Sequence, residues 1–364
     1  MIECCTYYII PKRDPNRRMA IHFNGRVFWF DKDNTETAQQ FLFVPIGGNK
    51  YNILTCQTSQ RTKGERLGVD TRGDVVRWSP KSDNTQEFAL TAPDKDGWFR
   101  IKEPTQGENL GVGPDGGLVR WWATGEDDQL FKLEVAQRST AKKPELDTVR
   151  KKEKPGAIPR LPERQSMDAM SDIQPKYLIG ETLEPAYFVT DPRYGIDKVQ
   201  QVLDHPWYLL RREQSWAKGF DRPWDGATER TLEETYLWGM ETTSAREMQV
   251  TTGTTIKADL GLKLEPKVDV KMIGAKAGSA GVDIGVEIKN ELQITSSSSE
   301  TAIQREEKKR TEKYLAGKPF RRAFLTLADY YTLQDESGYP LGAWSVLSDT
   351  TTDYWTYPNL MPKP

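Results

Sequence analysis

Residues 66–88 read RLGVDTRGDVVRWSPKSDNTQEF, and residues 109–131 repeat that pattern at the same spacing as NLGVGPDGGLVRWWATGEDDQLF. Both stretches contain Leu-Gly-Val, a glycine-bearing turn and Val-Arg-Trp, and Gln-x-Phe begins eight residues beyond the tryptophan. A looser copy occupies residues 19–41, where Phe28-Trp29-Phe30 precedes Gln39-Gln40-Phe41. A unit of short strands and turns cannot bury its own apolar face, so the three copies must assemble with one another.

The three units predict an all-β N-terminal domain over residues 1–136. Their pattern resembles the β-trefoil of the ricin B-chain family, whose units end in Gln-x-Trp, and the resemblance covers residues 17–135. Phenylalanine replaces the final tryptophan here, which is a mild change for a barrel core. We interpret six residues as core-forming rather than sugar-binding: Gln39, Phe41, Gln86, Phe88, Gln129 and Phe131.

The resemblance implies carbohydrate-binding sites at other positions of each unit. Such a site combines an early acidic residue, an aromatic platform and a polar residue before the glutamine, because sugars need both hydroxyl acceptors and an apolar stacking face. The first unit offers Asn24 and Trp29 without a well-spaced third residue, so we interpret it as degenerate. The candidate residues of the second unit are Asp70, Trp78 and Asn84, and those of the third are Asp115, Trp121 or Trp122, and Asp127.

Residues 132–176 contain no aromatic side chain, and residues 138–164 carry nine Lys or Arg and four prolines. Such a composition buries too little apolar surface to fold by itself, so we predict a flexible linker over residues 137–176. Exposed basic loops are also where proteases cut. Arg150-Lys151-Lys152 and Arg160 or Arg164 are therefore candidate sites of trypsin-like processing.

The predicted second domain, residues 177–364, is rich in aromatic residues, and its runs of apolar residues read as strands. Between Met248 and Ile294 every charged residue except Lys276 lies at an odd position, and the large apolar residues lie mainly at even ones. Lys276 belongs to a small, glycine-rich stretch that predicts a turn. This pattern predicts a hairpin whose arms exceed the roughly 9–11 residues that cross a bilayer. A permanently folded sandwich would show the same alternation.

Serine- and threonine-rich stretches flank the hairpin at residues 251–255 and 295–299. With them, the second domain resembles the pore-forming module of aerolysin-type toxins, which insecticidal crystal toxins and fungal haemolytic lectins place after a β-trefoil. The resemblance implies an elongated antiparallel β domain and favours a strand over a helix for the polar stretch 300–313. We place the membrane-inserting residues at Val268, Val270, Met272, Val282, Ile284, Val286 and Ile288.

Several function classes lack candidates in this sequence. A net charge of −2 provides no field for nucleic acid, and there is no metal-binding cysteine spacing or phosphate-binding glycine loop. We interpret His22 and His205 as structural. We therefore expect no enzyme, no cofactor and no metal. The amino terminus shows no basic stretch followed by an apolar run, so we expect a protein made in soluble form without a signal peptide.

The combined reading is a secreted or released toxin that acts at the target-cell membrane. Its trefoil would bind a cell-surface glycan or glycoconjugate, and its chains would oligomerise and insert the hairpin as a shared β-barrel. The resemblance also implies a partner toxin protein in some members. The alternative is a non-lytic carbohydrate-binding lectin with a β-rich structural second domain.

Overall fold

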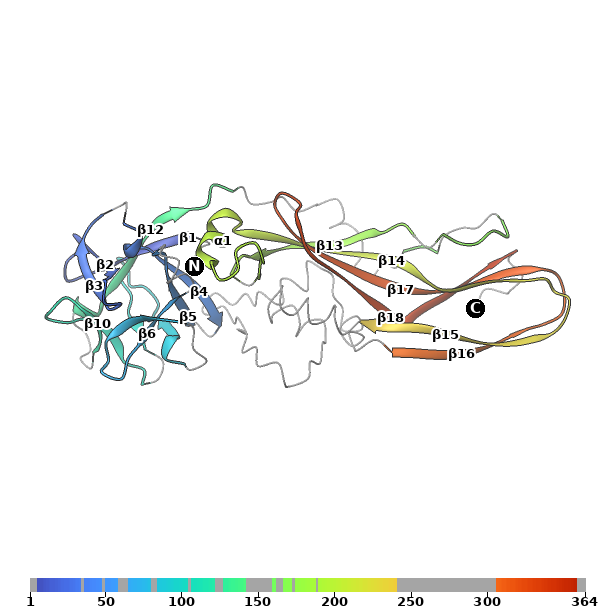
Figure 1. The fold of residues 1–364 in the computed structure, drawn as a ribbon, viewed down its shortest axis with the longest axis horizontal. Helices are drawn as coiled ribbons and strands as arrows, with labels where there is room; N and C mark the ends of the chain where they lie inside the picture. The colour runs from blue at the N-terminus through green and yellow to red at the C-terminus, as the bar shows by residue number, and fades with distance from the viewer. Residues whose placement is uncertain are drawn as a thin grey trace. The chain divides into compact units, whose positions relative to one another are not determined.

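The structure is a computed structural model (Figure 1). It describes residues 5–358 except 34–35, 48–49, 58–64, 80–83, 104–105, 122–126, 142–158, 162–165, 172–173, 188 and 241–305. These residues form two compact units. The first contains the chain up to Lys143 together with the later segment Pro185–Tyr208, which we call the excursion. The excursion lies within the range predicted for the second domain, and the predicted boundaries stay predictions.

The first unit consists of twelve short strands among its described residues. Its main sheet has the order β11-β10-β9-β8-β5-β4-β1-β12. In addition, β6 pairs with β5 and β7 pairs with β6, and β2 and β3 form a separate pair. The strands are β1 (Cys5–Pro11), β2 (Arg17–Ile21), β3 (Val27–Asp31), β4 (Phe41–Gly47), β5 (Lys50–Thr55), β6 (Arg66–Val69), β7 (Val75–Trp78), β8 (Phe88–Leu90), β9 (Ile101–Lys102), β10 (Asn109–Val112), β11 (Leu118–Trp121) and β12 (Phe131–Arg138).

Three hairpins, β2–β3, β6–β7 and β10–β11, close on one another in a cycle of backbone hydrogen bonds. Arg77 N donates to Gly25 O at 2.8 Å, Arg120 N to Gly73 O at 2.7 Å, and Trp29 N to Gly116 O at 3.0 Å. Each accepting glycine has a positive φ, between 84° and 91°, which residues with a Cβ rarely adopt. This cycle relates the three sequence repeats by a pseudo-threefold arrangement and confirms the predicted β-trefoil.

The Gln-x-Phe endings form part of the core, as predicted. Each glutamine ends a 3-10 turn: η1 (Thr37–Gln39), η2 (Asn84–Gln86) and η3 (Asp127–Gln129). The phenylalanines that follow are fully buried, and the glutamines are at most 3% exposed. Gln39 Nε2 donates to Asp31 O at 2.8 Å, and Gln86 Nε2 donates to Ser79 O at 2.9 Å. These two bonds satisfy buried amides and tie η1 and η2 to the end of the preceding hairpin.

The second unit is an antiparallel sheet of long strands. The order is β13-β14-β17-β18-β15-β16, with β13 (Tyr177–Pro185), β14 (Trp207–Trp224), β15 (Arg230–Met240), β16 (Glu306–Tyr314), β17 (Phe320–Asp335) and β18 (Pro340–Tyr357). The longest strands have 18 residues, which corresponds to about 60 Å at the usual rise of a strand. The second domain is thus the elongated β domain that the resemblance implies. Strand β16 also confirms the expected strand within the described part of residues 300–313.

Part of the predicted linker packs against the second unit. Leu161 and Met170 pack on a buried apolar cluster that includes Trp216 and Leu325. The indole Nε1 of Trp216 donates to Pro159 O at 2.8 Å, and Met170 N donates to Asp221 Oδ2 at 2.6 Å. We call the described residues 159–161 and 166–171 the strap. The composition of residues 137–176 does not indicate that the strap is ordered. Its side chains Leu161 and Met170 are partly buried against the sheet, not against one another.

The excursion contains one short helix, α1 (Lys198–Asp204), which lies beside β1 of the trefoil. Asp197 caps its amino end, with Oδ1 accepting from Gln200 N at 3.2 Å. Lys198 Nζ donates to the carbonyl oxygens of Ala186 and Val189, which closes the loop before the helix. This helix is not predicted from the sequence, because its seven residues are too few to show a helical period.

Candidate functional site

Asp70, the predicted acidic sugar ligand of the second unit, stabilises a turn. Its Oδ1 accepts from Arg72 N and from Asp74 N, both at 2.9 Å, and its Oδ2 lies 3.4 Å from the Arg72 guanidinium. The side chain is only 12% exposed. Both oxygens of this carboxylate are therefore engaged in contacts within the β6–β7 turn.

Trp78 lies at the opposite end of the same hairpin. Val69 and Val75 are paired next to the turn, whereas Trp78 pairs with Arg66 three residues further on. At the usual rise of a strand this separates the Asp70 and Trp78 main chains by about 10 Å. The structure therefore does not bring Asp70 to the aromatic platform.

Trp78 instead lies beside the 3-10 turn that begins with Asn84. A Cβ added to Gly68 would be 3.0 Å from Trp78 Cε3, 3.1 Å from Gln86 Cγ and 3.4 Å from Thr85 O. Because Gly68 has no side chain, the half-buried indole of Trp78 can lie next to η2 at this point. Asn84 is exposed at the start of this turn. An aromatic surface next to an exposed amide is a combination that suits a sugar.

The candidate residues of the third unit are also divided between the two ends of their hairpin. Asp115 Oδ1 accepts from Gly117 N at 3.0 Å within the β10–β11 turn. Asp127 begins η3 and forms an ion pair with Lys12 at 2.9 Å. The main chain of Trp121 pairs with Asn109, at the end of the hairpin away from its turn. This unit therefore repeats the separation seen in the second.

In the first unit, Trp29 does not align with Trp78 and Trp121 of the other two units. The cycle of hydrogen bonds places Trp29 at the position of Arg77 and Arg120, so Phe30 occupies the position of Trp78. Arg17 places its guanidinium 5.0 Å from the Trp29 ring centre, whereas Arg77 pairs with Glu65 at 2.7 Å. Trp29 therefore has a structural contact rather than a platform role. Counting residues from the sequence could not show this shift, because the first copy is longer.

The seven predicted membrane-inserting residues, Val268 to Ile288, lie outside the described residues. The strands on either side of this segment are described, and they pair with each other. Leu237 lies opposite Glu307, Tyr236 opposite Lys308, and Thr235 opposite Lys309. The described residues that flank residues 241–305 in the sequence therefore lie on paired strands.

In the parts of the chain that the structure describes, no helix is long and apolar enough to cross a membrane. The same residues contain no group of three or more side chains suited to hold a metal ion.

Comparison with known proteins places these features in context. Residues 177–359, just over half of the chain, match the family described as Insecticidal Crystal Toxin, P42. The insecticidal crystal protein Cry35Ab1 of Bacillus thuringiensis is 26% identical over 166 residues, an alignment that spans 42% of this chain and 40% of that relative. The crystal structure of Cry35Ab1 matches with a TM-score of 0.67 at 18% identity, and the match covers 99% of this chain and 91% of that one. The two proteins therefore share a fold.

Proposed function

Because the chain belongs to the P42 family of insecticidal crystal toxins, a family of toxins rather than enzymes, we propose that it acts by forming pores. The trefoil binds a cell-surface glycan or glycoconjugate, the chains oligomerise on the target membrane, and each chain inserts an amphipathic hairpin. The inserted hairpins join as one β-barrel. Closure is required because an open sheet edge leaves backbone groups without partners in lipid.

The observation that carries this proposal is the pairing of β15 with β16. The two strands flank residues 241–305 and run antiparallel in continuous register from Arg230–Tyr314 to Trp238–Glu306. The described strands on either side of residues 241–305 thus lie next to each other in one sheet. A segment anchored in this way can extend as two adjacent strands without breaking the sheet that holds it.

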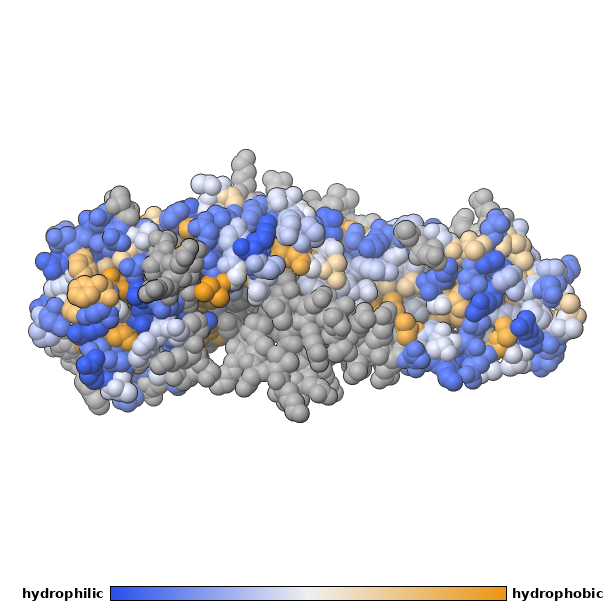
Figure 2. Space-filling view, viewed as in Figure 1, coloured by the Kyte–Doolittle hydropathy of each residue, from blue (hydrophilic) through white to orange (hydrophobic). Residues whose placement is uncertain are grey.

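The chemistry of the intervening sequence supports insertion. Its charged odd positions would face a water-filled lumen, and its apolar even positions would face lipid, as in known membrane barrels. On the face shown in Figure 2, the described residues are mostly hydrophilic, with apolar ones in small scattered groups. The described residues on that face offer no broad apolar surface, so membrane entry through them would depend on rearrangement.

The trefoil contributes the recognition step. Trp78 and Asn84 supply the aromatic surface and the amide described above, and the third unit offers Trp121 and Asp127 at equivalent places. The protein would be released or secreted and would work at the target membrane, as a homo-oligomer or together with a partner toxin.

Liposomes that carry target-cell glycoconjugates and an entrapped dye test this function. Protease-treated protein should release the dye, form oligomers that resist sodium dodecyl sulfate, and lose both effects when a competing glycan is added. A protein that agglutinates target cells but never releases dye or forms such oligomers would be a lectin without pore activity.

A further inference from the structure

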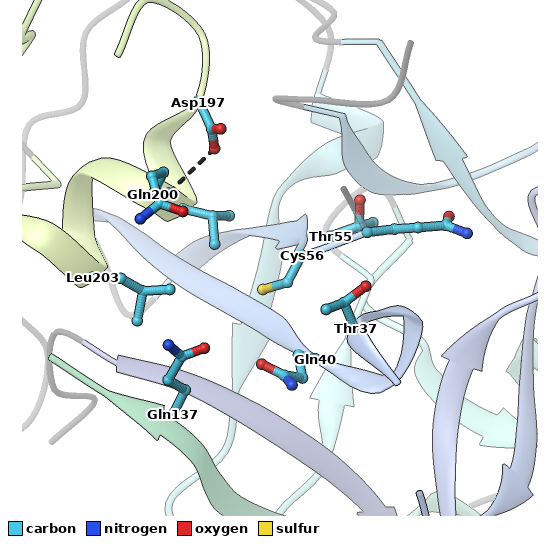
Figure 3. A pocket seen from close by; sticks show the side chains of 10 residues that line it. Thr37, Gln40, Thr55, Cys56, Gln137, Asp197, Gln200 and Leu203 are labelled. Atoms are coloured by element: carbon cyan, nitrogen blue, oxygen red, sulfur yellow. Dashed lines mark hydrogen bonds between the residues drawn. The ribbon is translucent and has the colours of Figure 1, made fainter. Parts of the chain in front are cut away.

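The first unit contains a cavity of about 130 Å³ between the trefoil and α1 (Figure 3). Gln40, Thr55 and Cys56 are buried and form its inner part, and Cys56 N donates to Gln40 O at 3.0 Å. Gln137 on β12 and Gln200 on α1 are exposed and lie at its rim. None of the candidate sugar-binding residues of the repeats lines this cavity.

The polar groups of the lining suit hydroxyl groups. Four glutamines contribute, and an amide side chain can donate and accept hydrogen bonds at once. The Gln40 oxygen accepts from Thr6 Oγ1 at 3.2 Å, so its NH2 is the group available to a ligand. Thr55 is 3% exposed, and its Oγ1 is buried without a hydrogen-bond partner. That oxygen has almost no accessible surface, so the groups open to a ligand are the amide side chains of the lining.

The charge of the lining disfavours anions. No lysine or arginine is among the described residues that line the cavity, and Asp197 is the one acidic residue there. Burial, together with the nearby Asp197 carboxylate, raises the pKa of the Cys56 thiol, so the sulfur stays protonated and uncharged. A phosphate or carboxylate would therefore find no counter-charge, whereas a neutral ligand needs none.

Size and shape narrow the ligand further. An engineered cavity of roughly 150 Å³ holds one benzene molecule, so about 130 Å³ accommodates a single six-membered ring. Leu203 and Val199 add a small apolar wall that suits the C–H face of such a ring. The open rim leaves space for substituents that project from it.

We propose that this cavity binds one neutral pyranose, either as a free sugar or as the terminal residue of a glycan. The site is separate from the repeat surface at Trp78, and its ligand would contact both the trefoil and α1. The first unit would then carry two sugar sites of different kinds: one on the surface that stacks on an indole, and a recessed one that relies on amides.

The test is a titration of the full chain with glucose, galactose, mannose and N-acetylglucosamine, and with the methyl glycoside of each. Ligand-observed NMR detects the binding. At least one sugar should bind. Gln137→Ala should lower its affinity about tenfold without lowering the melting temperature, since it removes only an exposed amide from the lining. Gln137→Trp, at the exposed rim, should block binding. Trp78→Ala should leave this binding unchanged. Binding of the methyl glycosides identifies a terminal glycan residue, and binding of reducing sugars alone identifies a free sugar.

The proposal is overturned if none of these sugars binds, if inorganic phosphate displaces a bound sugar, or if Gln137→Ala and Gln137→Trp both leave the affinity unchanged. Sugar binding that Trp78→Ala abolishes and the cavity variants preserve would also refute it. That last result would support the repeat surface of the proposed function, so the two claims fail separately.

Discussion

Leu237 on β15 lies directly opposite Glu307 on β16, although the chain between them contains the whole alternating segment. Both side chains are exposed, and the neighbouring positions carry oppositely charged pairs such as Glu233 with Lys309, at 3.0 Å. Exposed pairs of this kind contribute at most about 1 kcal/mol each. The strands that flank the segment are therefore held together mainly by their backbone ladder.

Trp78→Ala and Asp70→Ala should have different effects. The tryptophan change removes the aromatic surface and should weaken glycan binding at the repeat surface at least tenfold, about 1.4 kcal/mol. The aspartate change removes two turn hydrogen bonds and should lower the free energy of unfolding by roughly 1–2 kcal/mol, with glycan affinity retained. Glycan-array binding and chemical denaturation of both variants measure this. Equal losses of affinity would mean that Asp70 contacts the sugar.

Asp221 should control how firmly the strap is held. Its carboxylate accepts from Arg321 Nε at 2.7 Å and from Met170 N at 2.6 Å, and its side chain is only 4% exposed. Asp221→Ala leaves Arg321 and the strap amide without this acceptor, which should destabilise the second unit by about 3 kcal/mol. Trypsin should then cut at Arg160 about ten times faster.

Cleavage at Arg150, Lys151 and Lys152 serves as an internal control, because these residues precede the strap. Glu233→Gln is the matched variant, since it breaks an exposed ion pair and should change neither rate. If Asp221→Ala left the Arg160 rate unchanged, the strap would be held by its apolar contacts alone.

Lys198 should give the first unit an alkaline stability optimum. Burial lowers its pKa from 10.5 to about 8, so the unfolded chain binds this proton more tightly than the folded one. The free energy of unfolding should therefore rise by roughly 3 kcal/mol as the pH increases from about 8 to 10.5. Burial also raises the pKa of Tyr208, and that of Tyr194 to about 12, so stability should fall again above pH 10.

Thermal melts between pH 7 and 11 measure this dependence. In Lys198→Met the rise between pH 8 and 10 should disappear while the fall above pH 10 remains. A variant whose melting curve keeps the wild-type slope would assign the alkaline optimum to other groups.

Much of the architecture follows from local sequence. Phe88 and Phe131 repeat at a fixed distance from a glycine turn, and such spacing specifies a repeated unit whatever its surroundings. The strand at residues 306–314 is predicted only by the resemblance to aerolysin-type toxins, because its polar sequence shows no hydrophobic period of its own.

The features that sequence did not predict depend on distant contacts. Asp70 and Trp78 have the residue types of a sugar site, but only the hairpin register shows that they lie at opposite ends. Met170 belongs to a basic, proline-rich stretch, and its burial arises from a sheet more than forty residues away. Thr55 and Gln200 meet at a cavity only because the excursion packs on the trefoil.

The most direct test of the pore mechanism compares even and odd positions of the alternating segment in liposome dye release. Val270→Arg and Ile284→Arg would place a cation against lipid at a cost of up to about 2–4 kcal/mol each, so both should nearly abolish release. Asp269→Arg and Asp283→Arg place the same side chain one residue earlier, toward the lumen, and should preserve release while shifting ion selectivity toward anions. Equal release by the even and odd variants would contradict insertion of this hairpin.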